Sequence, residues 1–244
     1  MASPRSASSA SSVPDERSVG GAVLSIGLTG NVASGKSSVA HLWAQAGVPV
    51  VDADSLARVA VAPGTPGLAS VLGEFGAGML GADGELDRTK MRALVFRDPG
   101  ARHKLESLLH PRIAQLRGEW IEDRRLEGAP LVVSEVPLLF EAGMAGEFDR
   151  IVFVDAPEDE RLRRLVEDRG IAPDEAHRMI GAQEGPEKKR IQADHVIQND
   201  GSREELEKAA HALLADFRAL SLEADAAANA ESAPAPEVEM DRDA

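Results

Sequence analysis

The sequence predicts an α/β fold in which a five-stranded parallel sheet is covered by helices on both faces. Five short apolar runs alternate with stretches of helical periodicity, the pattern of strands joined by crossover helices. A glycine-rich loop stands between the first run and the first helix, and acidic side chains follow the second and third runs. Because ligands of such sheets bind outside the carboxyl ends of the strands, these loops are the predicted site.

The glycine-rich loop fits the pattern G-x-x-x-x-G-K-[ST] and consists of Gly30, Asn31, Val32, Ala33, Ser34, Gly35, Lys36 and Ser37. Residues 23–28 before it form an apolar run typical of a buried strand, and residues 36–46 after it predict a helix that Gly47 ends. The glycines let successive N–H groups point inward, and the helix adds its positive N-terminal end. The loop therefore predicts a phosphate-binding P-loop for a nucleoside triphosphate.

Two side chains of this loop have predicted roles in chemistry. The Lys36 ammonium is expected to reach the β- and γ-phosphates, and the Ser37 hydroxyl is placed to ligate Mg²⁺. The motif alone leaves open which nucleotide is bound and which molecule accepts the phosphoryl group.

Length and composition indicate one domain between two tails. Of the 244 residues, 1–21 are rich in Ser and Ala and 221–244 are acidic and rich in Ala, so both tails are expected to be disordered. The net charge of −14 leaves about −8 on residues 22–220, which argues against non-specific nucleic-acid or membrane-surface binding. The chain has no Cys, which excludes disulfides and suits a reducing cytoplasm. We expect a cytoplasmic monomer, with a higher oligomer left open.

The first half of the domain predicts a helical insertion. A second strand over residues 48–51 leads into Asp52 and Asp54, and the helix after them ends at a Pro-Gly break. From about 64 to 128 the periodicity is helical throughout, with helices expected at 68–75, 87–96, 99–109 and 112–126 and a break at His110-Pro111. Such a stretch is too long for an ordinary crossover and is the natural place to bind a second substrate.

The second half predicts three more strands and a lid. The strands cover residues 129–134, 151–154 and 195–197, and a last helix follows with Phe217 on its buried face. Between the last two strands, about 158–190, helices carry eight cations from Arg161 to Arg190. A lid that closes over the triphosphate would bring one or two of these cations to the phosphates, although a solvated helix face remains the alternative.

Several polar residues at the strand ends and breaks are candidates for the site. Asp54 is the candidate general base, unless it only caps its helix, and Asp52 could face the metal or the substrate. Glu135 could act on Mg²⁺ or the substrate, or pair with an arginine. His110 could touch an anionic substrate or only mark a helix boundary. The candidate lid cations are Arg169 and Arg190.

In their order and spacing these segments resemble the dephospho-CoA kinase family. The matching segments are the P-loop, Asp52-Ala53-Asp54 followed by Ala57-Arg58, Leu109-His110-Pro111, Pro137-Leu138-Leu139-Phe140-Glu141, Ala182-Gln183 with Lys189-Arg190, and residues 193–199. The resemblance covers about residues 23–217. It implies a P-loop NTPase of the nucleoside-monophosphate-kinase type, with a helical CoA-binding insertion and a lid. It also implies transfer of phosphate from ATP to the ribose 3′-hydroxyl of dephospho-CoA, the last step of coenzyme A biosynthesis.

The resemblance also implies roles for individual residues. Asp54 and Lys36 would be catalytic, Ser37 would bind Mg²⁺, and Asn199 would lie near the adenine of ATP. The expected substrate-binding residues are Asp52, Asp54, Arg58, His110, Glu135 and Leu139.

The chain departs from the family pattern at three places. These are Glu135 where Asp is familiar, Glu184-Gly185-Pro186 where Met-Pro is usual, and Asn31 where Gly is common. Another small-molecule kinase of nucleoside, nucleotide or shikimate type stays the nearest alternative. A non-catalytic nucleotide switch is disfavoured because the guanine-reading motif Asn-Lys-x-Asp is missing.

Overall fold

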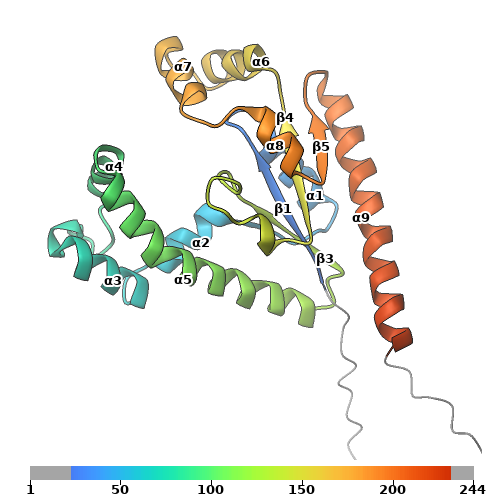
Figure 1. The fold of residues 1–244 in the computed structure, drawn as a ribbon, viewed down its shortest axis with the longest axis horizontal. Helices are drawn as coiled ribbons and strands as arrows, with labels where there is room; N and C mark the ends of the chain where they lie inside the picture. Colours follow the sequence, from blue (N-terminus) through green and yellow to red (C-terminus); the bar gives the residue numbers. More distant parts are fainter. Residues whose placement is uncertain (1–22, 232–244) are drawn as a thin grey trace, which may run out of the picture.

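The computed structural model describes residues 23–231, and these form a five-stranded parallel sheet with helices around it (Figure 1). The strand order is β2-β3-β1-β4-β5. The strands are β1 (Leu24–Gly30), β2 (Val50–Asp52), β3 (Leu131–Glu135), β4 (Arg150–Asp155) and β5 (His195–Gln198). The predicted five-stranded parallel sheet is confirmed, and the P-loop follows its central strand.

One face of the sheet packs against two helices, α1 (Lys36–Gln45) and α9 (Arg203–Glu231). Alternate residues of the strands supply the apolar side chains, as the period of a β-strand requires. Trp43 of α1 is fully buried, donates a 2.8 Å hydrogen bond from Nε1 to the carbonyl of Ala210, and meets the Phe217 ring edge-on at 6.2 Å. This core fixes the start of α1, and therefore the P-loop, against the sheet.

The other face is covered by the chain between β3 and β4, which includes a 3₁₀ turn at Ala145–Glu147. Gly27 of β1 makes room for it: a Cβ at this position would lie 2.7 Å from Leu139 Cδ1 and 2.8 Å from a ring carbon of Phe148. We name residues 136–147 the acceptor segment, because several of them line a cavity described below.

The predicted helical insertion stands away from the sheet as an arm (Figure 1). The elements within the predicted bounds of about 64–128 are α3 (Pro66–Phe75), a 3₁₀ turn (Ala77–Met79), α4 (Arg88–Arg97) and α5 (Pro99–Leu126), and α2 (Ala53–Ala60) precedes them. The predicted cap is present, since the Asp87 carboxylate accepts a 2.9 Å hydrogen bond from the backbone N–H of Lys90. A separate small core holds the arm together, with Val61, Leu68, Val71, Leu86 and Met91 buried in it.

The region predicted to be a lid consists of short helices over the carboxyl ends of the strands, and we keep the name lid for it (Figure 1). These are α6 (Glu158–Arg163), a π-helical turn (Arg164–Asp168), α7 (Pro173–Gly181) and α8 (Pro186–Gln192). Turns of this π-helical kind are frequent at functional sites. None of the helices within residues 23–231 is both long and apolar enough to cross a bilayer.

Two sequence-based expectations about helices are wrong. The predicted break at His110-Pro111 does not occur, because α5 runs through Pro111 without interruption. A proline inside a helix loses one backbone hydrogen bond, and here the packing of α5 against α2, α3 and α4 keeps the helix continuous.

The C-terminal tail was expected to be disordered from residue 221, but α9 continues to Glu231. Alanine and glutamate after Phe217 are strong helix formers and extend it, and Ser221 is still buried. The prediction of disorder also covered residues 1–21 and 232–244, and these lie outside the described part of the chain.

Candidate active site

The P-loop forms a tight concave turn between β1 and α1. Ala33 and Gly35 have left-handed backbones, with φ of 59° and 97°. A Cβ at Gly35 would lie 2.1 Å from Asn199 Nδ2, so only glycine fits this position next to Asn199. The loop leads directly into the N-terminus of α1 at Lys36, where backbone N–H groups and the helix dipole favour an anion.

Glu135 brings the third strand into contact with the P-loop. Its Oε1 accepts hydrogen bonds from Lys36 Nζ and, at 2.7 Å, from Ser37 Oγ. β3 lies beside β1 in the sheet, with Leu28 opposite Glu135, which explains the contact. The predicted position of Glu135 next to the P-loop therefore agrees with the structure, and its partner is a lysine instead of an arginine.

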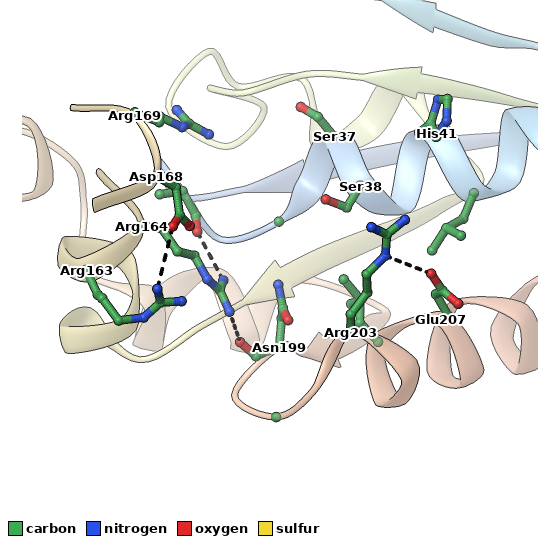
Figure 2. A pocket seen from close by; sticks show the side chains of 15 residues that line it. Ser37, Ser38, His41, Arg163, Arg164, Asp168, Arg169, Asn199, Arg203 and Glu207 are labelled. Atoms are coloured by element: carbon green, nitrogen blue, oxygen red, sulfur yellow. Dashed lines mark hydrogen bonds and ion pairs between the residues drawn. The ribbon is translucent and has the colours of Figure 1, made fainter. Parts of the chain in front are cut away.

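A cavity of about 620 Å³ opens beside the P-loop, and we name it the donor cavity (Figure 2). Side chains from the P-loop, the first turns of α1, the lid and the start of α9 line it, among them Ser37, Ser38, His41, Arg164, Arg169 and Asn199. Two of the predicted residues, Arg169 and Asn199, therefore face the same cavity as the P-loop. Its positive lid side chains and backbone donors suit a nucleoside triphosphate.

Arg164 was one of several lid arginines in the sequence, and the structure distinguishes it from the others. Its guanidinium donates to the carbonyls of Ala33 at 3.2 Å, Ser34 at 3.4 Å and Asn199 at 3.0 Å. Asn199 Nδ2 donates in turn to the Ser34 carbonyl at 2.7 Å. Periodicity could not single out Arg164 among interleaved charges, because its partners are backbone carbonyls distant in the sequence.

A second cavity of about 340 Å³ lies between α2, α5 and the acceptor segment, and we name it the acceptor cavity. It brings together Asp54 and His110, as the sequence analysis expected of residues that bind one substrate. The other lining residues are mostly small or apolar: Ala53, Ala57, Ile113, Ala114, Val136, Pro137, Leu138, Ala142 and Met144, with Glu147 at one side.

Glu147 and its partner Arg117 were not anticipated. The Glu147 carboxylate accepts a hydrogen bond from Arg117 Nη2, and this buried guanidinium lies 4.9 Å from the centre of the Phe148 ring. Burial lowers the pKa of Arg117, which still leaves a cation to balance Glu147. A lone arginine on a long helix gives no sequence signal for such a pair.

The structure gives Asp52 a capping role and places Leu139 in the core. The Asp52 carboxylate caps α2 by accepting hydrogen bonds from the N–H groups of Asp54 at 3.1 Å and Ser55 at 3.2 Å. Asp54, for which capping was the alternative, is therefore not the cap and stays exposed in the acceptor cavity. Leu139 is fully buried in the core, and its neighbour Leu138 lines the cavity instead.

Arg58 lies apart from the other expected substrate-binding residues, and Arg190 lies apart from the donor cavity that Arg169 lines. Arg58 lines a separate hollow of about 230 Å³ together with Arg88. Arg190 forms an ion pair with the buried Asp155 at the end of β4, at 2.5 Å from Nη2 to Oδ2, and is not among the described residues that line the donor cavity. Its guanidinium neutralises a carboxylate that would otherwise be buried without a partner.

The oxygen atoms next to the P-loop fit Mg²⁺. Ser37 Oγ and the Glu135 carboxylate lie 2.7 Å apart and are hard oxygen ligands. Within residues 23–231, no cluster of three or more His, Asp or Glu side chains could hold a metal on its own. Mg²⁺ in phosphoryl-transfer sites is typically held by one or two protein ligands plus the phosphates of the substrate, which this arrangement allows.

Comparisons with known proteins agree with this geometry. A profile of the dephospho-CoA kinase family matches residues 24–205. A dephospho-CoA kinase from Anaeromyxobacter dehalogenans is 45% identical over 193 residues, which are 79% of this chain and 92% of the relative. The corresponding enzyme of Corynebacterium diphtheriae is 42% identical over 192 residues, 79% of this chain and 96% of the relative.

Solved structures show the same architecture. The crystal structure of TT1252 from Thermus thermophilus has a TM-score of 0.68 and 40% identity, covering 80% of this chain and 97% of that one. A dephospho-CoA kinase from Campylobacter jejuni has a TM-score of 0.60 at 22% identity, covers 79% of this chain and 96% of its own, and supports the fold alone. Together with the P-loop and its donor cavity, these matches identify the chain as an ATP-dependent kinase that belongs to the dephospho-CoA kinase family.

Proposed function

We propose that the protein transfers the γ-phosphoryl group of ATP to the ribose 3′-hydroxyl of dephospho-CoA, with Asp54 as the general base. The observation that carries this proposal is the position of Asp54, an exposed carboxylate in a mostly apolar cavity that is also lined by Val136, the residue after Glu135. Asp52, two residues before it, lies opposite Glu135 in the sheet, and Glu135 contacts Lys36. The base and the phosphate-binding lysine thus follow the two strands on either side of β3, which carries Glu135 between them.

Each charged group then has a defined task. A carboxylate near the attacking hydroxyl accepts its proton as the new phosphate ester bond forms. Lys36 neutralises charge on the β- and γ-phosphates, and the lid arginines Arg164 and Arg169 close the donor cavity from the other side. Mg²⁺, held by Ser37 and Glu135, would supply further positive charge to the phosphates.

The acceptor cavity suits the adenosine end of dephospho-CoA. Its walls of Ala, Ile, Pro and Leu side chains offer apolar contact to a flat base, and the carboxylate of Asp54 offers an acceptor to a ribose hydroxyl. His110, exposed in the same cavity, is placed to meet an anionic part of the substrate. We also propose that the protein is a monomer and that it carries out this last step of coenzyme A synthesis in the cytoplasm.

The experiment is ADP formation from Mg-ATP with dephospho-CoA, AMP, adenosine, shikimate or no acceptor. We expect turnover confined to dephospho-CoA, and a fall of about a hundredfold or more in kcat for Asp54→Asn. Asp123→Asn is the matched control, because Asp123 is an exposed aspartate on α5 that lines neither cavity.

Two results would contradict the proposal in different ways. Turnover of dephospho-CoA with an active Asp54→Asn variant would keep the reaction and remove Asp54 as the base. Turnover of shikimate or a nucleoside in place of dephospho-CoA would overturn the acceptor assignment and leave a P-loop kinase of another specificity.

A further inference from the structure

The ammonium group of Lys189 is buried at the junction between the P-loop and the acceptor segment. Lys189 belongs to α8 and has no exposed surface. Its Nζ donates to Asn31 Oδ1 at 2.7 Å and to Glu141 Oε1 at 2.5 Å. Burying an ammonium costs free energy unless the group is paired and hydrogen-bonded. The contacts with Asn31 and Glu141 offset this cost for Lys189.

The two partners of Lys189 belong to two segments of chain that line different cavities. Asn31 is the first variable residue of the P-loop, which lines the donor cavity further along. Glu141 lies inside the acceptor segment, between Leu138 and Ala142, which both line the acceptor cavity. One charge therefore contacts the P-loop on one side and the acceptor segment on the other.

Other contacts hold the same end of the P-loop from the lid. The backbone N–H of Val32 donates to Gln183 Oε1 at 2.7 Å, and Asn31 Nδ2 approaches the carbonyl of Glu184 at 3.4 Å. With Arg164 on Ala33 and Ser34, all four variable residues of the loop, 31–34, are bound by side chains or backbone from residues 164–199. The shape of the P-loop thus depends on chain far from it in sequence.

Lys189 differs from the other residues that hold the P-loop, because it also forms an ion pair with Glu141 of the acceptor segment. Without its ammonium, Asn31 Oδ1 loses its donor and Glu141 loses its ion-pair partner. Both segments would then shift, and small displacements of reacting groups reduce rates strongly.

We propose that Lys189 is a positioning residue that holds the P-loop and the acceptor segment in register, so that the γ-phosphate and the acceptor hydroxyl meet. The inference rests on the proposed function for the identity of the acceptor, while its donor half needs only ATP binding. Nothing in the proposal requires Lys189 to touch either substrate.

The test compares Lys189→Met with Asn31→Ala and with the double variant of both. We expect Lys189→Met to lower kcat by about tenfold or more and to raise KM for ATP and for dephospho-CoA, each by about fivefold or more. Asn31→Ala should raise KM for ATP alone. In the Lys189→Met/Asn31→Ala variant, KM for ATP should exceed that of Lys189→Met alone by less than about twofold, because the two residues act through one hydrogen bond.

Lys188→Met is the matched control for removing a lysine charge from α8. Lys188 is the next residue on the same helix, is exposed, and makes an i,i+4 pair with Glu184 at 2.6 Å. This hydrogen bond lowers the pKa of Glu184, and neither side chain of the pair lines the donor or the acceptor cavity. Glu184 contacts Asn31 through its backbone carbonyl, which the substitution leaves in place. We expect both KM values of this variant to stay within about twofold of wild type, as is usual for exposed pairs.

Lys189→Met/Glu141→Leu separates positioning from stability. Replacing both partners of a buried pair by apolar side chains often restores stability, so its unfolding midpoint should return close to that of wild type. The proposal expects both KM values to remain raised in this stable variant, because Asn31 and the acceptor segment are still not held.

The inference is overturned if Lys189→Met/Glu141→Leu restores both KM values together with stability. It is also overturned if Lys189→Met changes neither KM by more than about twofold. If wild type does not phosphorylate dephospho-CoA, the proposed function fails separately. In that event the dissociation constant of a non-hydrolysable ATP analogue still decides the donor half: a fivefold rise in Lys189→Met supports it and an unchanged value removes it.

Discussion

The donor cavity and the acceptor cavity are built from different kinds of contact. Around the donor cavity, charged and amide side chains bind backbone carbonyls and N–H groups, as Arg164 and Asn199 do on the P-loop. The acceptor cavity is lined mainly by small apolar side chains, with Asp54 and His110 exposed within it. The first site is shaped by hydrogen bonds and the second by side-chain volume.

This difference reflects what each site has to recognise. A triphosphate carries the same charges in every substrate molecule, so a fixed set of donors can be arranged for it in advance. An organic acceptor is selected by shape and by a few polar contacts. Loss of a polar group should therefore affect the donor site most, and a change of volume should affect the acceptor site most.

The largest effect is expected from removing the P-loop ammonium. Lys36→Met keeps most of the side-chain volume but removes the charge that meets Glu135 and is placed to meet the phosphates. We expect kcat to fall by about a thousandfold, as for the loss of a strong transition-state donor. Single-turnover rates measured at saturating ATP test this, with the exposed Lys104→Met as control. A loss below tenfold would contradict the role of Lys36.

A steric change should affect only the acceptor side. Ala114 lines the acceptor cavity from α5, and Ala114→Leu adds three carbon atoms to a space of about 340 Å³. We expect KM for dephospho-CoA to rise by about tenfold or more, with unchanged affinity for ATP. Ala69→Leu, on the exposed side of α3, is the control. Equal loss of ATP affinity in Ala114→Leu would mean that the two cavities are not independent.

The sequence predicted the donor site in more detail than its surroundings. Local patterns identify the P-loop, because strand, glycines, lysine and helix follow one another within a few residues. They also place Asp54 and Glu135, which follow strands whose ends meet at one edge of the sheet.

Contacts that join distant segments could not be predicted in the same way. Lys189 was one cation among eight in the lid sequence, and its burial depends on Glu141 and Asn31 meeting it in space. The continuity of α5 through Pro111 was hidden for a related reason: local propensity favoured a break, and packing against three other helices overrides it.

A moderate effect is expected from the lid. Arg164→Ala removes the donor to the carbonyls of Ala33, Ser34 and Asn199. We expect KM for ATP to rise by about tenfold and KM for dephospho-CoA to stay within about twofold, since the lost bonds shape only the donor site. Steady-state kinetics with each substrate varied in turn measure this, with the surface variant Arg102→Ala as control. A selective rise in KM for dephospho-CoA would reverse the assignment of Arg164 to the donor side.

The smallest effect is expected from Asp52, and it tests whether this carboxylate is structural. Asp52→Asn keeps an oxygen that can cap α2, whereas Asp52→Ala removes the cap and should cost about 1 kcal/mol of unfolding free energy. For a chain of this size that cost corresponds to a fall of about 2–4 °C in Tm, which thermal unfolding can resolve.

Both Asp52 variants should keep kcat within about threefold of wild type, because the capping oxygens point to the N–H groups of Asp54 and Ser55. If Asp52→Asn instead lowers kcat more than tenfold without a change in Tm, its charge acts on substrate or metal. The acceptor side would then contain two working carboxylates, and its contrast with the polar donor side would become weaker.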